Sequence, residues 1–357
     1  MVRALCLAAT LAVALGGCAP VEGEAEQPRL TITPPPEVLP MQAAANESDE
    51  GVRGILFVAN KRGNTLSKID LATGVEVMRE DSCTNPHELT VSPTGRYVAL
   101  ACYGGTTVDI FDTINLKRRA SIDLGDNARP HGIVWDAKEG QIFVTAEGRQ
   151  SIMRVDDAFT RKPIVADFKT NQQGSHMLAV SPDGKTAWTT DLGSKTVTRV
   201  DLRGAKEPLS IEVGEEPEGI ALSPDGGTLW VSARRSDKAF ALDPETLQIR
   251  AELNTGPFPL RLAIRPQGDF AVTSNLANGS LSVIDLGEGE VVREIAVSSA
   301  AEAEKRQQVT ILWSNDGKRI YVAETGTDTV AEVDFASGKV LRRLKTGKGG
   351  DGMAILD

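Results

Sequence analysis

The chain has 357 residues, of which 39 are basic and 49 acidic, so its formal charge is −10 at neutral pH. This acidic balance argues against nucleic-acid binding, because neutralising phosphates requires a basic surface. Only 4% of the residues are aromatic and 34 are glycine, a composition typical of many short strands joined by tight turns.

The N-terminus has the pattern of a lipoprotein signal peptide over residues 1–17. Arg3 provides a positive charge, and residues 4–15 form an apolar stretch that is too short to remain as a membrane-spanning helix. Small residues directly before Cys18 resemble a bacterial lipobox, in which the cysteine receives a lipid and becomes the mature N-terminus. We therefore expect lipidation at Cys18; the alternative is a soluble secreted protein with an incidental cysteine.

Residues 18–53 have the composition of a flexible tether. They contain three consecutive prolines and many acidic and small residues, and they lack an alternating apolar pattern. Ala19 follows Cys18, where an aspartate would indicate retention in the inner membrane. We expect an exported protein whose lipid anchor holds it to the membrane, in the outer membrane and facing the periplasm.

Residues 54–357 consist of one motif repeated seven times. Seven apolar, strand-like runs each end in an aspartate, with gaps of 42, 44, 45, 42, 42 and 49 residues by subtraction: Asp70, Asp112, Asp156, Asp201, Asp243, Asp285 and Asp334. This period is that of a four-stranded propeller blade. A carboxylate at the end of a strand can accept hydrogen bonds from the amides of the following turn, so we expect these aspartates to be structural.

The two ends of this region complete the ring. Residues 54–80 contain only the second, third and fourth strands of a blade, whereas residues 352–357 form a lone first strand. Joining them removes an exposed sheet edge. The sequence therefore predicts an all-β fold, a seven-bladed β-propeller of four-stranded antiparallel blades, closed by the C-terminal strand joining the N-terminal blade.

Residues 220–226 and 229–232 resemble the YVTN-type β-propeller repeats of YncE-like bacterial proteins. The resemblance extends over residues 54–357 and implies the propeller fold, with cytochrome-d1-type reductases and lactonase-like propellers as distant relatives. The family includes proteins of unknown role, binding proteins and enzymes, so the resemblance implies no particular reaction.

The three histidines of the chain occupy equivalent positions in three consecutive repeats. Alignment on the first turn of each repeat gives one column: His87, His131, His176, Glu218, Leu260, Val309 and Gly352. In a propeller these positions converge at one end of the central channel. Three imidazoles and the Glu218 carboxylate there would suit a divalent metal, zinc or copper. A metal-free site for a ligand and a merely solvated polar ring are the alternatives.

Other side chains are expected on the same face. Loops after the second strands contribute Asn60, Cys102, Glu147, Asp191, Arg234, Arg235, Asn275 and Glu324, and Glu88 and Arg261 stand beside the histidine column. This mixture of charges suits a small polar molecule. The candidate ligand-binding residues are His87, His131, His176, Glu218, Arg261, Arg235, Asp191 and Asn275.

Cys83 and Cys102 flank the first two strands of one blade, which form a hairpin. Their sulfurs should approach each other on the face that bears the histidines, and an exported compartment is oxidising. We expect a disulfide; free thiols would instead favour a copper or redox site.

Three functions are compatible with these patterns. The first is a propeller that binds a small polar ligand, a metal ion or a protein partner through its histidine-bearing face. The alternatives are a lactonase-like or metal-assisted hydrolase, and a copper-dependent oxidoreductase that also uses Cys83 and Cys102. The sequence has no Cys-X-X-Cys-His haem motif, no phosphate-binding glycine loop and no Gly-X-Ser-X-Gly motif.

Overall fold

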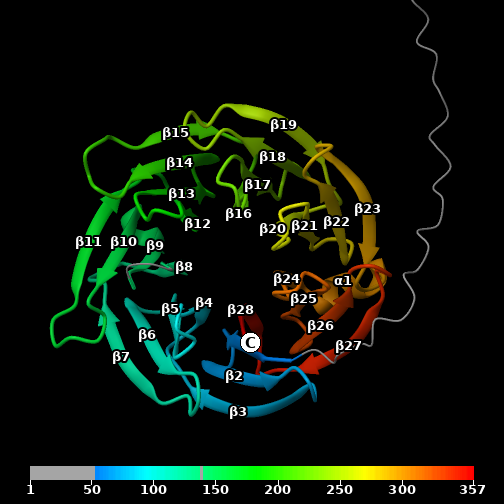
Figure 1. Ribbon diagram of the computed structural model, residues 1–357, viewed down its shortest axis with the longest axis horizontal. Coiled ribbons are helices and arrows are strands. Elements are labelled where there is room, and N and C mark those ends of the chain that lie inside the picture. Colours follow the sequence, from blue (N-terminus) through cyan, green and yellow to red (C-terminus); the bar gives the residue numbers. More distant parts are fainter. Residues whose placement is uncertain (1–52, 137–139) are drawn as a thin grey trace, which may run out of the picture. The chain divides into compact units, whose positions relative to one another are not determined.

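The computed structural model describes residues 53–136 and 140–357, which form a ring of seven four-stranded antiparallel sheets (Figure 1). This confirms the predicted seven-bladed β-propeller. The first strand of each blade lies nearest the central channel and the fourth lies on the outside of the ring. The signal peptide, the tether as far as residue 52 and Cys18 lie outside the described residues.

The blades are numbered in chain order, each from its innermost to its outermost strand. Blade 1 consists of β28 (Gly350–Leu356), β1 (Ile55–Asn60), β2 (Thr65–Asp70) and β3 (Val75–Asp81). Blades 2 to 4 consist of β4 (Pro86–Val91), β5 (Tyr97–Cys102), β6 (Thr107–Asp112) and β7 (Arg118–Asp123); β8 (Pro130–Trp135), β9 (Ile142–Ala146), β10 (Ser151–Asp156) and β11 (Ile164–Lys169); and β12 (Ser175–Val180), β13 (Thr186–Asp191), β14 (Thr196–Asp201) and β15 (Leu209–Glu212). Blades 5 to 7 consist of β16 (Pro217–Leu222), β17 (Leu229–Ala233), β18 (Lys238–Leu242) and β19 (Ile249–Asn254); β20 (Pro259–Ile264), β21 (Phe270–Asn275), β22 (Ser280–Asp285) and β23 (Glu290–Ala296); and β24 (Gln308–Trp313), β25 (Arg319–Glu324), β26 (Thr329–Asp334) and β27 (Val340–Lys345).

The ring closes through the C-terminal strand, as predicted. β28 pairs antiparallel with β1, so that Leu356 lies opposite Ile55 and Ala354 lies opposite Phe57. The strand begins at residue 350, two residues earlier than the sequence indicated. Every innermost strand therefore has a hydrogen-bonded partner, and blade 1 combines both ends of the propeller chain.

Most of the repeated aspartates hold the turns that follow them. Backbone amides of the next turn donate to the side chains of Asp70, Asp112, Asp201, Asp243, Asp285 and Asp334. Asp156 differs, because Gln141 and Arg154 hold its carboxylate. The core lies between blades: Trp188 and Trp230 are 3% exposed, as expected of residues that pack one sheet on the next.

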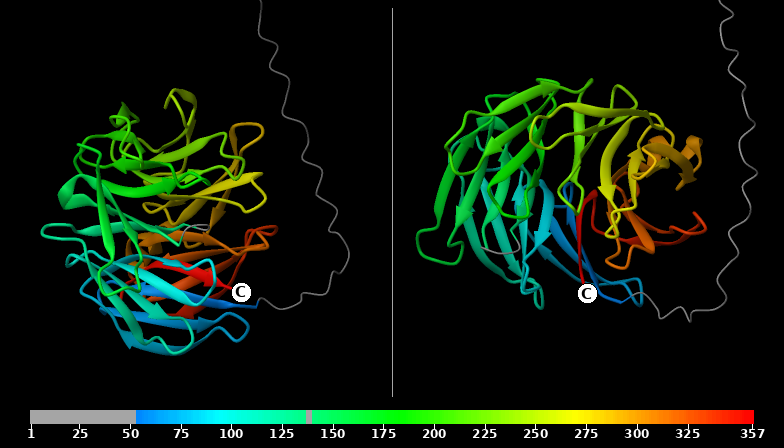
Figure 2. Two further views of the ribbon diagram at one scale, coloured as in Figure 1. Left: turned by 60° about the vertical axis from the view of Figure 1, so that its left-hand side comes forward. Right: turned by 45° about the horizontal axis from the view of Figure 1, so that its top comes forward.

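Strands run between the two faces of the ring (Figure 2). We call one of these the mouth face: it carries the loops directly after β1, β5, β9, β13, β17, β21 and β25. Two short helices, η1 (Glu147–Arg149) and α1 (Ala300–Arg306), come directly after β9 and directly before β24. β1 begins at the opposite face with Ile55 and ends at the mouth face with Asn60. No helix in the described part of the chain has the length and apolar composition needed to cross a bilayer.

Candidate functional site

The three histidines lie together at the channel end of the mouth face. Each is the second residue of an innermost strand: His87 in β4, His131 in β8 and His176 in β12. The ring centroids of His87 and His131 are 4.6 Å apart, and those of His131 and His176 are 3.6 Å apart. The equal positions in consecutive blades thus place three imidazoles in one row, here called the stack, in which neighbouring rings are tilted by 52° and 32° to each other.

Gly132 permits the closest of these contacts. A Cβ at this position would lie 2.9 Å from the carbonyl oxygen of His176 and 3.0 Å from the Cα of Met177. Only glycine therefore lets β8 approach β12 so closely next to the channel. This approach brings the rings of His131 and His176 into contact.

Two residues of the mouth-face loops complete the histidine cluster. Tyr103 follows β5, and its ring centroid lies 4.6 Å from that of His87 and 5.4 Å from that of His131. Its hydroxyl donates to Oε2 of Glu147, the first residue of η1, at 2.8 Å. Burial and this carboxylate raise the pKa of Tyr103 to about 12, so the hydroxyl stays protonated and keeps donating.

His176 is held between two carboxylates. Its Nδ1 lies 2.5 Å from Oε1 of Glu147, and its Nε2 lies 3.4 Å from Oε1 of Glu218. Burial alone would lower the pKa of His176, but the two carboxylates together raise it above its usual value. By contrast, burial and the neighbouring His176 hold the pKa of His131 well below its usual value.

A buried ion network lies under the cluster. The guanidinium of Arg261 pairs with Glu218 and, at 2.9 Å, with Oε1 of Glu88, and Arg234 also pairs with Glu218. Arg261 and the two carboxylates are each no more than 8% exposed in their side chains. Although burial opposes ionisation, Arg261 and His176 hold the pKa of Glu218 far below its usual range.

Asp351 is the seventh member of the histidine column, where the spacing of the repeats had placed Gly352. The pairing of Gly350 with Asn60 matches that of Pro86 with Cys102, so the residue after each occupies the same position. Oδ2 of Asp351 lies 2.8 Å from Nζ of Lys61 and 3.8 Å from Nε2 of His87. Burial is the main reason that the pKa of His87 falls to about 4, although Asp351 opposes it.

Several of these residues line a cavity of about 400 Å³ at the channel mouth, whereas Tyr103, Glu147 and Glu88 lie behind its lining. Its charged and imidazole side chains are Lys61, Arg62, His87, His131, His176, Glu218, Arg234, Arg261 and Asp351. Its apolar side chains are Phe258, Leu260, Leu276 and Val309. The described lining residues therefore include four cationic side chains and only two carboxylates, and the cavity has an apolar side next to these charges.

Three predicted site residues do not line this cavity. Asp191 ends β13 and is fully buried inside its blade, where Ser175, Thr189, Thr196 and Thr198 donate to its carboxylate. Asn275 ends β21, and its side-chain amide donates to the hydroxyls of Ser280 and Ser282 within the same blade. Arg235 is 60% exposed and pairs with Glu216 outside the mouth. Asp191 and Asn275 therefore stabilise blades.

The prediction from sequence named the last residue of the second strand in five blades, Asn60, Cys102, Asp191, Asn275 and Glu324, whereas Glu147 and Arg234 were correctly named as residues that follow this strand. The last strand residue points into the blade, and the next residue faces the mouth: Lys61, Tyr103, Glu147, Arg234, Leu276 and Thr325 all occupy this following position. Of these, only Glu147 and Arg234 were identified from the sequence; Lys61, Tyr103, Leu276 and Thr325 were not. Because successive side chains along a strand point to opposite sides, the alternation of apolar and polar residues could have distinguished the last strand residue from the residue after it.

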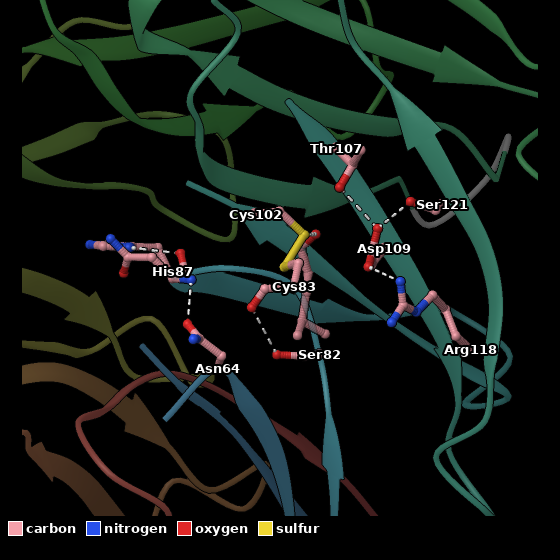
Figure 3. The surroundings of a disulfide bond; sticks show 11 residues. Asn64, Ser82, Cys83, His87, Cys102, Thr107, Asp109, Arg118 and Ser121 are labelled. Carbon is pink, nitrogen blue, oxygen red and sulfur yellow. Dashed lines mark hydrogen bonds and ion pairs between the residues drawn. A yellow bond between two sulfur atoms is a disulfide. The ribbon is translucent and has the colours of Figure 1, made fainter. Parts of the chain in front are cut away.

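Cys83 and Cys102 form a disulfide, with their Cα atoms 5.7 Å apart (Figure 3). It joins the segment before β4, the strand that carries His87, to the end of β5, the strand that Tyr103 follows. With the sulfurs bonded to each other, they are not available as thiolate ligands, so a copper site that uses these cysteines loses its donors.

Comparison with known proteins shows similarity of fold. No protein-family model matches the chain, and no curated protein sequence matches it. A functionally unknown protein from Desulfotomaculum acetoxidans superposes with a TM-score of 0.71 at 13% identity, covering 85% of this chain and 98% of the other. A protein from Bacteroides fragilis assigned as a 6-phosphogluconolactonase gives 0.66 at 14%, covering 87% and 100%. Streptogramin B lyase gives 0.64 at 16%, covering 76% and 87%. At these identities the chain shares the propeller fold with proteins that include a lyase and a lactonase-like protein.

Proposed function

We propose that the protein binds a small molecule that carries an anionic group and an apolar portion, in the cavity at the channel mouth. The observation that carries this proposal is the division of the cavity lining into two parts. Lys61, Arg62 and Arg234 present cationic groups, whereas Phe258 and Leu276 present apolar surface. A cavity of this size with a few convergent polar groups is typical of ligand sites.

Arg62 is the cation best placed to meet such a ligand. Its side chain is 49% exposed, and its nearest carboxylate, that of Asp328, lies 3.6 Å away. Its guanidinium also donates to the carbonyl oxygen of Thr325, which holds it at the edge of the cavity. Lys61, Arg234 and Arg261 are each engaged more closely by buried or half-buried carboxylates. An anionic group therefore gains most from Arg62, while the other cations fix the shape of the cavity.

A thermal-shift and calorimetric comparison of phenylacetate, phenylacetamide and acetate tests the proposal. We expect phenylacetate to stabilise the protein more than either of the others, because only it has both the charge and the ring. Saturation at about 100 times Kd would contribute about 2.7 kcal/mol. Arg62→Gln and Phe258→Ala should each weaken binding about tenfold, and Arg235→Gln should not. Equal responses to all three compounds would contradict the proposal.

The proposal includes export and lipid attachment at Cys18, with the propeller in the periplasm. The support is the sequence of residues 1–18, together with a disulfide that suits an oxidising compartment. Metabolic labelling with a palmitate analogue should mark the wild-type protein in the membrane fraction, whereas Cys18→Ala should remain unlabelled. Labelling of the Cys18→Ala variant would rule out this anchor.

Hydrolysis of a lactone is the second candidate. It is favoured by the imidazoles of His131 and His176 lining a cavity that can admit a substrate, and by propeller neighbours that include a lactonase-like protein and a lyase. Acid release from glucono-δ-lactone is the direct assay. A rate above background that disappears in His131→Asn would favour catalysis over binding alone.

A further inference from the structure

We infer that His131, His176 and Glu147 form a binding site for one divalent transition-metal ion, with zinc as the ion that these donors suit. The inference deepens the proposed function, on whose mouth cavity it rests. It replaces the set expected from the sequence, His87, His131, His176 and Glu218, by one in which Glu147 is a ligand.

The three donors are close enough for one ion. One ligand atom from each of His131, His176 and Glu147 lies within 4.8 Å of the others. The shortest separation, between Nδ1 of His176 and Oε1 of Glu147, is 2.5 Å. Zinc binds imidazole nitrogen at about 2.0–2.1 Å and carboxylate oxygen at about 2.0–2.2 Å. Small rotations of these side chains would bring all three donors to such distances.

His131 supplies an independent sign of a missing partner. Its side chain is 1% exposed, and its Nδ1 has no hydrogen-bond partner among the described residues. An unpaired buried polar atom is destabilising and calls for an explanation. The ring of His176, whose centroid lies 3.6 Å away at an interplanar angle of 32°, does not form a hydrogen bond with this nitrogen. A cation bound by both imidazoles would give Nδ1 of His131 the partner that it lacks.

The outer contacts are those that orient metal ligands. Nε2 of His176 faces Oε1 of Glu218 at 3.4 Å, and this carboxylate is itself held by Arg261 and Arg234. The Tyr103 hydroxyl holds Oε2 of Glu147 at 2.8 Å and leaves Oε1 toward His176. Carboxylate–histidine–metal chains of this kind fix the tautomer of the ligand. Glu218 is therefore an orienting group and not a ligand.

The site also has an accessible side. His131 and His176 line the mouth cavity, so an ion held by them would face it. Two imidazoles and one carboxylate leave coordination positions for water or an anionic ligand, as in open zinc sites. Imidazole donors disfavour magnesium and calcium, which prefer oxygen. His87 lies at the far end of the stack, against Asp351.

Zinc titration of chelator-treated protein tests the inference by calorimetry and by metal analysis after gel filtration. We expect one zinc per chain, with affinity reduced at least 100-fold in Glu147→Gln and His176→Asn. Tyr103→Phe, which removes the hydrogen bonds that this hydroxyl makes with Glu147 and with Arg129, should weaken zinc binding about 10- to 100-fold. His87→Asn is the matched control from the same stack and should retain zinc.

Failure of the metal site can be told apart from failure of the proposed function. Any of three results would overturn the metal site. The first is the absence of saturable zinc binding by the wild-type protein, and the second is zinc binding by Glu147→Gln as tight as that by the wild-type protein. The third result is a loss of zinc affinity in His87→Asn equal to the loss in His176→Asn. Thermal unfolding of each variant shows whether it is folded. Where a ligand variant fails to fold, the zinc affinity of Tyr103→Phe still tests the metal site. Phenylacetate binding by metal-free protein tests the cavity alone, so it can succeed when the metal site fails.

Discussion

Arg261 and Glu88 form an ion pair across the central channel, between strands of blades 6 and 2. Nη2 of Arg261 lies 2.9 Å from Oε1 of Glu88, although 173 residues separate them in the chain. The same guanidinium also pairs with Glu218 of the adjacent blade 5. One side chain thus connects three blades at the level of the mouth.

Loss of Arg261 should destabilise the whole ring. Arg261→Met leaves the carboxylates of Glu88 and Glu218 buried without their common partner, and breaking a buried pair in this way costs about 3–5 kcal/mol. Urea unfolding measures the effect. Adding Glu88→Gln to Arg261→Met should recover part of the loss, because one uncompensated charge is removed. Arg235→Gln, which breaks an exposed ion pair, should change stability by less than about 0.5 kcal/mol.

Asp191 should make stability depend on pH in a definite direction. Burial raises its pKa from 3.8 to about 6, despite four hydroxyl donors. The folded state therefore binds a proton that the unfolded state releases between these values. Its contribution to the unfolding free energy is complete below about pH 3.8 and falls by about 3 kcal/mol as pH rises through 6.

Asp191→Asn tests this dependence. The amide does not titrate, so the stability difference between the variant and the wild-type protein should grow in favour of the variant from about pH 4 to about pH 7. Asn275 occupies the equivalent position in blade 6 and already bonds two serine hydroxyls. The reciprocal substitution Asn275→Asp should add a similar dependence of the unfolding free energy on pH. Parallel stability curves for the wild-type protein and Asp191→Asn would show that Asp191 does not titrate in this range.

The disulfide should stabilise the blade that carries His87. Cys83 and Cys102 are 19 residues apart, and a loop of about this length gains about 3 kcal/mol from closure. Serine at both positions should lower the unfolding midpoint, and dithiothreitol should then have no further effect. In the wild-type protein, dithiothreitol should produce the same decrease. An unchanged midpoint in both experiments would show that the crosslink adds nothing to stability.

Removal of β28 should open the ring. Deleting residues 350–357 exposes the edge of β1 and removes Asp351, the partner of Lys61. Exposed strand edges pair with other chains, so we expect a large loss of stability together with oligomers in light scattering. Supplying residues 346–357 as a separate peptide should restore monomers. A monomeric truncated protein of normal stability would show that closure through β28 is dispensable.

The fold could be predicted from the sequence because one local pattern is repeated. Each blade needs an alternating apolar pattern and a turn at a fixed place, and seven copies of this pattern leave few other arrangements. The coming together of His87, His131 and His176 follows from the same argument, since equal positions in consecutive blades must share one end of the channel. Ring closure by the C-terminal strand could be read from the incomplete repeats at the two ends.

The details of the site depend on strand register, which the repeat spacing does not specify. A shift of one residue moves a side chain to the other side of a strand. For this reason the sequence placed Gly352 in the histidine column, where the structure has Asp351. For the same reason it assigned Asp191 and Asn275 to the mouth, although both side chains point into their blades. Tyr103 could not be assigned a role from the sequence, because its contact with Glu147 joins loops of two blades.

The start of β1 at the face opposite the mouth determines how the propeller can be attached to a surface. Gly54 lies beside Leu356, and its carbonyl oxygen accepts a hydrogen bond from the amide of Leu71, at the end of the ring remote from the histidines. A bead, a sensor chip or a fused protein joined ahead of residue 54 would therefore be connected at the rear of the molecule. Immobilised in that way, the protein would keep its cavity open to the solution.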